Sequence, residues 1–148
     1  MKSMLTLLLT VASTVALARP DVGDKSHNFS ATSLTGQSIS LQQYNGEAVN
    51  LVFLDSLCPM PHFPGCEEKI AKLNKQVAAK PQANWVGFIS SFYVDQGIAE
   101  AFRDKYHIKI PLVFDLDNKE FQQYQVFATP YLIRLDNEHK IVERGDAF

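Results

Sequence analysis

The chain has two cysteines, Cys58 and Cys66, with seven residues between them. An apolar run over 49–54 precedes the first cysteine, and a run with helical spacing over 67–77 follows the second. A cysteine between a buried strand and the start of a helix gains thiolate stabilisation from the helix N-terminus. The pattern therefore favours a reactive thiol whose neighbour is a disulfide partner or a second soft metal ligand. A purely structural disulfide is the third use of such a pair.

The redox interpretation needs one exposed nucleophilic thiolate and one resolving thiol close to it. Cys58 is the expected nucleophile because it follows the strand directly, and Cys66 is the expected resolving thiol. The two roles are exchanged if the helix begins at Cys66. Prolines at three loop positions fix φ and stiffen the connection: Pro59, Pro61 and Pro64.

The metal interpretation adds His62, which lies midway between the cysteines, and Met60. Cysteine, histidine and methionine side chains are ligands that suit Cu(I), so copper is the alternative ligand of this loop. His107, further along the chain, is interpreted as a helix-end residue rather than a ligand.

Four charged residues are further candidates for a role in the site or in its loops. Asp55, three residues before Cys58, either transfers protons as a base or anchors the loop through hydrogen bonds. Arg134 or Arg144 would assist a peroxide-binding thiolate if Cys58 were a peroxidase nucleophile. Asp115 is expected to be a loop residue after a strand.

Residues 1–18 have the pattern of a secretory signal peptide. Lys2 gives a basic start, an apolar stretch follows, and Ala16-Leu17-Ala18 fits the A-x-A cleavage rule. The predicted mature chain is one domain, 19–148, with no membrane span, and its expected location is the periplasm. Removing Lys2 leaves 13 of the 14 basic residues against 16 acidic ones, a net charge of about −3, with no basic patch. Nucleic acid is therefore not an expected partner.

The rest of the chain alternates strand-like and helix-like patterns, which predicts an α/β fold with one sheet and helices on both sides. The patterns predict these elements: a hairpin-like unit over 29–34 and 37–41, strands over 48–54, 85–89 and 110–114, helices over 67–79, 96–106 and 118–124, and a terminal hairpin over 130–135 and 140–144.

Three segments carry a family resemblance: 29–36 with 40–46, the strand–cysteine–helix unit over 51–74, and 124–130 with the terminal hairpin. In their order and spacing they are similar to the thioredoxin superfamily, and most closely to exported redoxins of the TlpA and AhpC/TSA types. The resemblance implies a thioredoxin-like fold, a central mixed sheet flanked by helices with an N-terminal hairpin extension. It also implies that Pro130 is a cis-proline that faces the cysteine loop and shapes a substrate groove.

The activity implied is that of a thiol–disulfide oxidoreductase that cycles Cys58 and Cys66 without a cofactor. Its partners would be protein thiols or disulfides and a second redox protein. Sco copper chaperones share this general plan, which keeps a copper(I) protein using Cys58, His62 and Cys66 as an alternative. A peroxiredoxin-like thiol peroxidase is another.

The chain also departs from the family pattern. The common motif is C-x-x-C, so the cysteine loop here has five extra residues. Leu57 replaces the tryptophan that often precedes the first cysteine, and the peroxiredoxin pattern P-x-x-x-T/S-x-x-C is absent. The terminal helix is expected to be missing or reduced to a stub, which would expose one sheet face or leave it to a partner.

Overall fold

The computed structural model describes residues 18–61 and 65–148. The predicted signal peptide, except Ala18, and the predicted ligand His62 lie outside these ranges. The elements in chain order are β1 (Ser30–Thr32), β2 (Ser38–Ser40), the 3-10 helix η1 (Leu41–Tyr44), β3 (Val49–Leu54), α1 (Cys66–Ala79), β4 (Asn84–Ser90), α2 (Gln96–Lys105), β5 (Leu112–Asp115), the 3-10 helix η2 (Leu116–Asn118), α3 (Lys119–Tyr124), β6 (Tyr131–Leu135) and β7 (Ile141–Gly145). Among the described residues, no helix combines the length and apolar character that a membrane crossing requires.

Five strands form one mixed sheet in the order β5-β4-β3-β6-β7. The neighbours β3, β4 and β5 run parallel, whereas β6 is antiparallel to β3 and β7 is antiparallel to β6. Leu51 of the central strand lies opposite Val86 of β4 and Ile133 of β6. The strand that leads to the first cysteine is therefore held by hydrogen bonds on both sides. This arrangement confirms the predicted mixed sheet with its antiparallel terminal hairpin.

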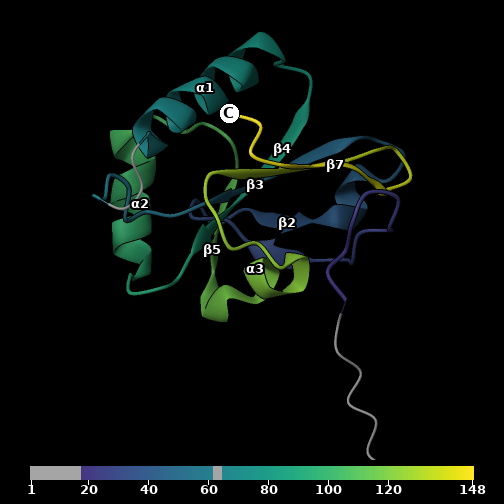
Figure 1. Cartoon of the computed structure of the whole chain (residues 1–148), viewed down its shortest axis with the longest axis horizontal. Coiled ribbons are helices and arrows are strands. Elements are labelled where there is room, and N and C mark those ends of the chain that lie inside the picture. The colour runs from purple at the N-terminus through teal and green to yellow at the C-terminus, as the bar shows by residue number, and fades with distance from the viewer. Residues whose placement is uncertain (1–17, 62–64) are drawn as a thin grey trace, which may run out of the picture.

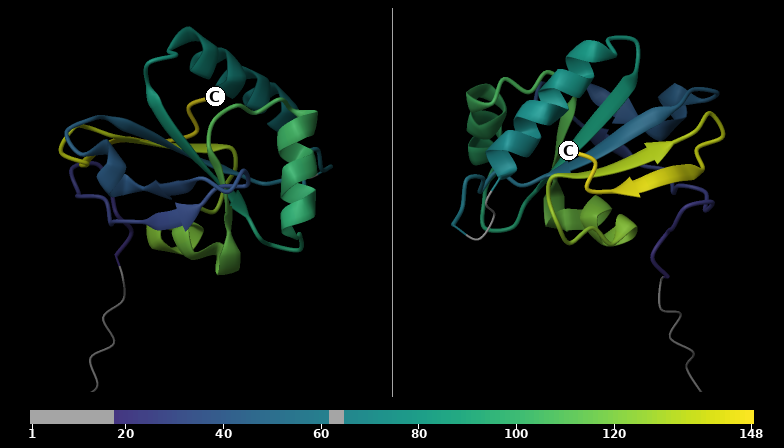
Figure 2. Two further views of the ribbon diagram at one scale, coloured as in Figure 1. Left: turned by 180° about the vertical axis from the view of Figure 1, so that it is seen from behind. Right: turned by 45° about the horizontal axis from the view of Figure 1, so that its top comes forward.

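The first core lies between the sheet and the helices α1 and α2, which cover the same face (Figures 1 and 2). Val52 and Leu54 point into it from β3, because alternate side chains of a strand face opposite sides. Ile70 and Leu73 reach them from α1, and Phe102 from α2. Burying one such side chain contributes about 1.5–3 kcal/mol. This packing fixes α1, and with it Cys66, against the end of β3.

The second core lies on the opposite face, under α3 and the β1–β2 hairpin. Phe53 lies between Val52 and Leu54 in β3 and points to this opposite face. Its ring contacts those of Phe88 and Phe121, with centroid separations of 5.4 and 5.1 Å. The hairpin adds Phe29 and Ile39. The predicted N-terminal hairpin extension thus closes the face that α1 and α2 do not cover.

Asp115 is not the loop residue that was predicted. It is the last residue of β5, and its side chain is buried, with 3% of the residue exposed. Its carboxylate accepts hydrogen bonds from the backbone N–H groups of Glu120 and Phe121 at 2.9–3.0 Å. It satisfies donors at the start of α3 that have no partner within that helix. Burial raises the pKa of Asp115, and these donors oppose that rise.

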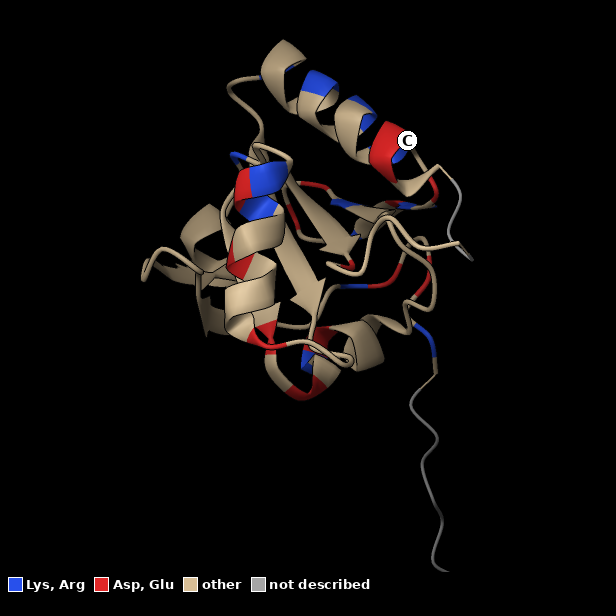
Figure 3. Ribbon diagram, turned by 90° about the vertical axis from the view of Figure 1, so that its left-hand side faces the viewer, with Lys and Arg blue, Asp and Glu red and all other residues tan. Residues whose placement is uncertain are grey.

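Helix α1 begins at Cys66, one residue earlier than predicted. Gly65 precedes it with φ of 85°, a conformation that favours glycine. Glu67 and Glu68 occupy the first turn, where negative charge is stabilised by the helix dipole. Figure 3 shows this acidic first turn in red next to the C-terminus, with basic residues further along the helix.

Residues 146–148, which follow β7, are not helical. Instead Asp146 pairs with Lys69, and the carbonyl of Ala147 accepts a hydrogen bond from Gln76 Nε2 at 3.0 Å. These contacts dock the last residues on α1. The expected exposed sheet face is not found at β3 and β6, where Val52 and Leu132 are fully buried.

Candidate active site

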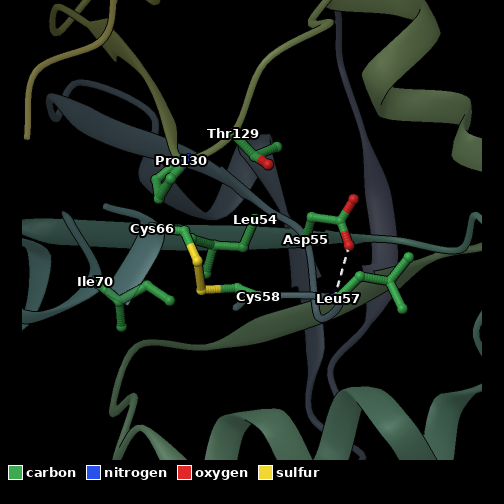
Figure 4. Close-up of a pocket in the computed structure, with 8 residues that line it drawn as sticks. All are labelled: Leu54, Asp55, Leu57, Cys58, Cys66, Ile70, Thr129 and Pro130. Atoms are coloured by element: carbon green, nitrogen blue, oxygen red, sulfur yellow. Dashed lines mark hydrogen bonds between the residues drawn. A yellow bond between two sulfur atoms is a disulfide. The ribbon is translucent and has the colours of Figure 1, made fainter. Parts of the chain in front are cut away.

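Cys58 and Cys66 are joined in a disulfide, with 6.0 Å between their Cα atoms (Figure 4). Each comes from a different element. Cys58 lies four residues beyond the end of β3, and Cys66 is the first residue of α1. The two cysteines are thus held at the end of a central strand and at a helix N-terminus. Cys66 is 6% exposed, whereas Cys58 is only partly buried, so Cys58 is the more accessible residue of the two.

A small pocket surrounds the disulfide, with a volume of about 10 Å³, roughly the space of one water molecule. Its lining comes from three segments: Leu54, Asp55, Leu57, Cys58, Cys66, Ile70, Thr129 and Pro130. The Thr129–Pro130 peptide bond is cis, as predicted. Figure 4 shows Pro130 on the Cys66 side of the disulfide. The proline loop before β6 and the cysteine loop after β3 are therefore walls of one site.

Asp55 anchors the cysteine loop. Its Oδ1 accepts a hydrogen bond from the backbone N–H of Leu57 at 2.8 Å, which fixes the turn that leads into Cys58 (Figure 4). This is the anchoring role considered from the sequence. Asp55 also lines the pocket, and its proton-transfer role stays a prediction.

An apolar groove lies beside the disulfide pocket and shares Asp55 and Thr129 with it. The groove has a volume of about 290 Å³. Two of its aromatic side chains are largely exposed, Phe92 at 60% and Phe127 at 89%. Exposed apolar surface of this kind is typical of interaction sites. The lining of this groove was not predicted from the sequence, because it comes from segments that are distant along the chain: the ends of β3 and β4, the start of α3 and the loop before β6.

Tyr106 is a residue of the site that was also not predicted from the sequence. It follows the last residue of α2, and its hydroxyl lies 2.7 Å from Glu67 Oε1 and 3.3 Å from the carbonyl oxygen of Cys58. Lys105 Nζ lies 3.8 Å from the same Glu67 oxygen and 4.7 Å from the centre of the Tyr106 ring. Burial raises the pKa of Tyr106, and the hydrogen bond to Glu67 acts in the same direction.

The two arginines considered for peroxide chemistry do not line the pocket. Arg134 pairs with Glu143 at 2.7 Å. Arg144 donates to the carbonyl oxygens of Tyr124 and Pro20 and to the hydroxyl of Tyr131. Arg134 therefore stabilises the terminal hairpin, and Arg144 connects that hairpin to Pro20 and Tyr124.

The described residues hold no cluster of three or more histidine, cysteine or acidic side chains that could bind a metal ion. His107 is the helix-end residue that was predicted, with its N–H bonded to the carbonyl of Asp104 at 3.2 Å. The proposed copper ligand His62 is outside the described ranges, so the copper set of Cys58, His62 and Cys66 stays a prediction.

Comparison with known proteins gives a family and a fold. A model of the AhpC/TSA family matches residues 22–144. The thiol-disulfide oxidoreductase ResA of Bacillus thuringiensis (strain Al Hakam) is 27% identical over 124 residues, which cover 83% of this chain and 68% of ResA.

Two solved structures have the same fold. A secreted Mycobacterium tuberculosis disulfide oxidoreductase homologous to E. coli DsbE has a TM-score of 0.68 at 22% identity, over 81% of this chain and 84% of that one. StoA of Bacillus subtilis has a TM-score of 0.67 at 20% identity, over 80% and 86%. These likenesses establish the thioredoxin-like fold that the sequence predicted.

Proposed function

The chain belongs to the AhpC/TSA family, and we propose that it is an exported thiol–disulfide oxidoreductase that cycles Cys58 and Cys66. One observation carries the proposal: a disulfide between a helix-start cysteine and a more accessible cysteine lies in one pocket with Pro130. A purely structural bridge requires neither access for a second molecule nor a groove beside it. ResA and the similar M. tuberculosis protein are both named as oxidoreductases, which supports the same activity here.

The reaction is a two-electron exchange through a mixed disulfide. A thiolate of the target attacks the sulfur of Cys58, a new sulfur–sulfur bond forms, and Cys66 leaves as a thiolate. The second thiolate of the target then attacks the target's first sulfur in the mixed disulfide, and Cys58 leaves as a thiolate. The target disulfide forms, the protein is left with two thiols after protonation, and two electrons have moved to the protein. The reverse sequence reduces a target disulfide.

The division of roles follows from two competing effects. The helix begins at Cys66, which favours the Cys66 thiolate and satisfies the condition under which the roles would be exchanged. Cys66 is buried, however, and an attacking sulfur must approach in line with the disulfide, so Cys58 is the sulfur that a protein target can reach. A stabilised thiolate is also a good leaving group. We therefore assign Cys58 as the sulfur that exchanges with the target, because it is accessible. We assign Cys66 as the leaving or resolving thiol, because its thiolate is stabilised.

The target is a protein that presents its cysteine beside apolar residues. The groove with Phe92 and Phe127 opens next to the disulfide pocket and offers such residues a surface. We infer export from the leader pattern of residues 1–18, which would be cleaved before Arg19, and a periplasmic location follows. Disulfide exchange with folding proteins is a reaction of such oxidising compartments.

The test is a thiol titration of the protein in graded glutathione buffers, with and without Cu(I). A reversible two-electron transition that copper does not change supports the proposal. Stoichiometric Cu(I) protection of both thiols that is lost in His62→Ala would favour the copper protein instead. A disulfide that is reduced only when the protein unfolds would leave it a structural bridge.

The roles of the two cysteines are tested by trapping. Cys66→Ser should accumulate a mixed disulfide between Cys58 and glutathione, because no resolving thiol remains. The matched variant Cys58→Ser should react more slowly, since its remaining thiol is buried. Faster trapping in Cys58→Ser would exchange the two roles.

A further inference from the structure

Tyr106 contacts both ends of the cysteine loop from outside that loop, because its hydroxyl lies near both Cys58 and Glu67. One acceptor near its hydroxyl is the carbonyl oxygen of Cys58, at 3.3 Å. The other is a carboxylate oxygen of Glu67, at 2.7 Å, and Glu67 directly follows Cys66. The shorter contact is charge-assisted and is the stronger of the two. In the longer contact, the carbonyl oxygen of Cys58 is a weak second acceptor for the same hydroxyl proton.

The tyrosine itself is fixed on several sides. Its backbone carbonyl accepts a hydrogen bond from Asn74 Nδ2 of α1 at 2.8 Å. Its ring packs on Phe102 of α2 with 5.1 Å between centroids. Both α1 and α2 are held on the sheet by the buried core between them. The hydroxyl is therefore presented to the loop ends by a rigid support rather than by a mobile side chain.

We propose that Tyr106 is a positioning residue that links Cys58 to the first turn of α1 and so holds the two thiols close together when the disulfide is reduced. This inference rests on the proposed redox cycling. The disulfide and the hydroxyl contact connect the same two segments, one covalently and one through hydrogen bonds. Two constraints on the same segments reinforce each other, and this coupling is reciprocal.

The consequence concerns the equilibrium between dithiol and disulfide. Reduction by two glutathione thiols gives two protein thiols and one glutathione disulfide, and the loop ends are then free to separate. A contact that keeps them close raises the effective concentration of one thiol at the other. Tyr106 therefore favours the disulfide, and removing its hydroxyl should make the disulfide easier to reduce.

The experiment measures the equilibrium constant with glutathione in Tyr106→Phe, which keeps the ring on Phe102. We expect a shift of about three- to ten-fold toward the dithiol, which corresponds to about 14–30 mV for a two-electron couple. Glu67→Ala removes the partner and should shift the constant in the same direction. The double variant should shift it no further than Tyr106→Phe alone, because the phenylalanine variant already lacks both hydroxyl contacts, including the one to Glu67. Glu67→Ala also tests the contact independently if the phenylalanine variant does not fold.

Glu68→Ala is the matched control. It removes a carboxylate from the same helical turn, but that carboxylate pairs with Lys72 at 2.9 Å and not with Tyr106. It should change the constant less than two-fold. An effect as large as that of Glu67→Ala would assign the shift to charge near the helix start and overturn the inference.

Two further results separate this inference from the proposed function. A wild-type protein that titrates reversibly, with Tyr106→Phe within two-fold of it, would overturn the positioning role alone. A wild-type disulfide that resists reduction until the protein unfolds would overturn the proposed function and the positioning role with it.

Discussion

Reducing the Cys58–Cys66 disulfide should lower the free energy of unfolding by about 2.5 kcal/mol. The bond closes a loop between cysteines separated by eight positions. The chain-entropy relation for a loop of this size gives about 8 cal/mol/K, or about 2.5 kcal/mol at 25 °C. The Cα atoms lie 6.0 Å apart, inside the usual range for bonded cysteines, so the fold accommodates the bond without moving the backbone.

The same number has a functional meaning through a thermodynamic cycle. The difference in unfolding free energy between the oxidised and reduced forms equals the difference in disulfide stability between the folded and unfolded chains. A value of about 2.5 kcal/mol makes the disulfide about sixty-fold harder to reduce in the folded protein than in the unfolded one. The fold would then favour the oxidised state, and the protein in its dithiol form would be the better reductant.

The assay is urea unfolding of the oxidised protein and of the protein kept in dithiothreitol. Fluorescence of Trp85, which is buried in the core below α1 and α2, reports the transition. Cys58→Ser is the control, because its stability should not depend on the reductant. A reduced form as stable as the oxidised one, or more stable, would refute the reasoning. A more stable reduced form would mean that the folded structure disfavours the bond, as expected of a protein that oxidises its targets.

Two further changes test the groove and the buried carboxylate. Phe127→Ala should lower kcat/KM for a protein target about ten-fold, a loss of about 1.4 kcal/mol, while the glutathione midpoint stays unchanged. Leu116→Ala, at a residue that is also largely exposed but outside the groove, should leave both unchanged. Because burial raises the pKa of Asp115, the folded protein binds this proton more tightly than the unfolded chain, so its contribution favours folding at low pH and declines as pH rises through the folded-state pKa. Asp115→Asn should remove that decline, which unfolding curves across the acid range would show.

The fold could be predicted because the patterns that determine it are local. The apolar run of β3 and the amphipathic spacing of α1 each follow from a few neighbouring residues, and their order identifies the layers. The ends of elements were less accurate. Strand β5 begins at Leu112 rather than at residue 110, because Pro111 has no N–H group for the sheet. Asp115 was misread because its partners, the N–H groups at the start of α3, follow only after a 3-10 turn.

The site could be predicted only in part. The two cysteines stand out in the sequence itself, and the cis peptide before Pro130 was implied by the family resemblance. The contact of Tyr106 with Cys58 joins residues 48 positions apart in sequence, and the helical pattern over 96–106 gives no sign of it. A tyrosine at the end of such a face was the available signal, because a tyrosine that packs its ring against a core usually finds a hydrogen-bond partner for its hydroxyl. The identity of that partner depends on how the helices pack.

The long cysteine loop and the contacts around it are connected by one physical argument. In a C-x-x-C motif both cysteines lie within about one helical turn, so the helix itself sets their separation. Here seven residues intervene, and only Cys66 belongs to α1. The position of Cys58 must therefore be set by other contacts: the strand β3 before it, the hydrogen bond from Leu57 to Asp55, and the hydroxyl of Tyr106. Each of these acts on the segment that ends at Cys58. A loop that lost them would keep its two cysteines in sequence but would lose the preorganised distance on which exchange between them depends.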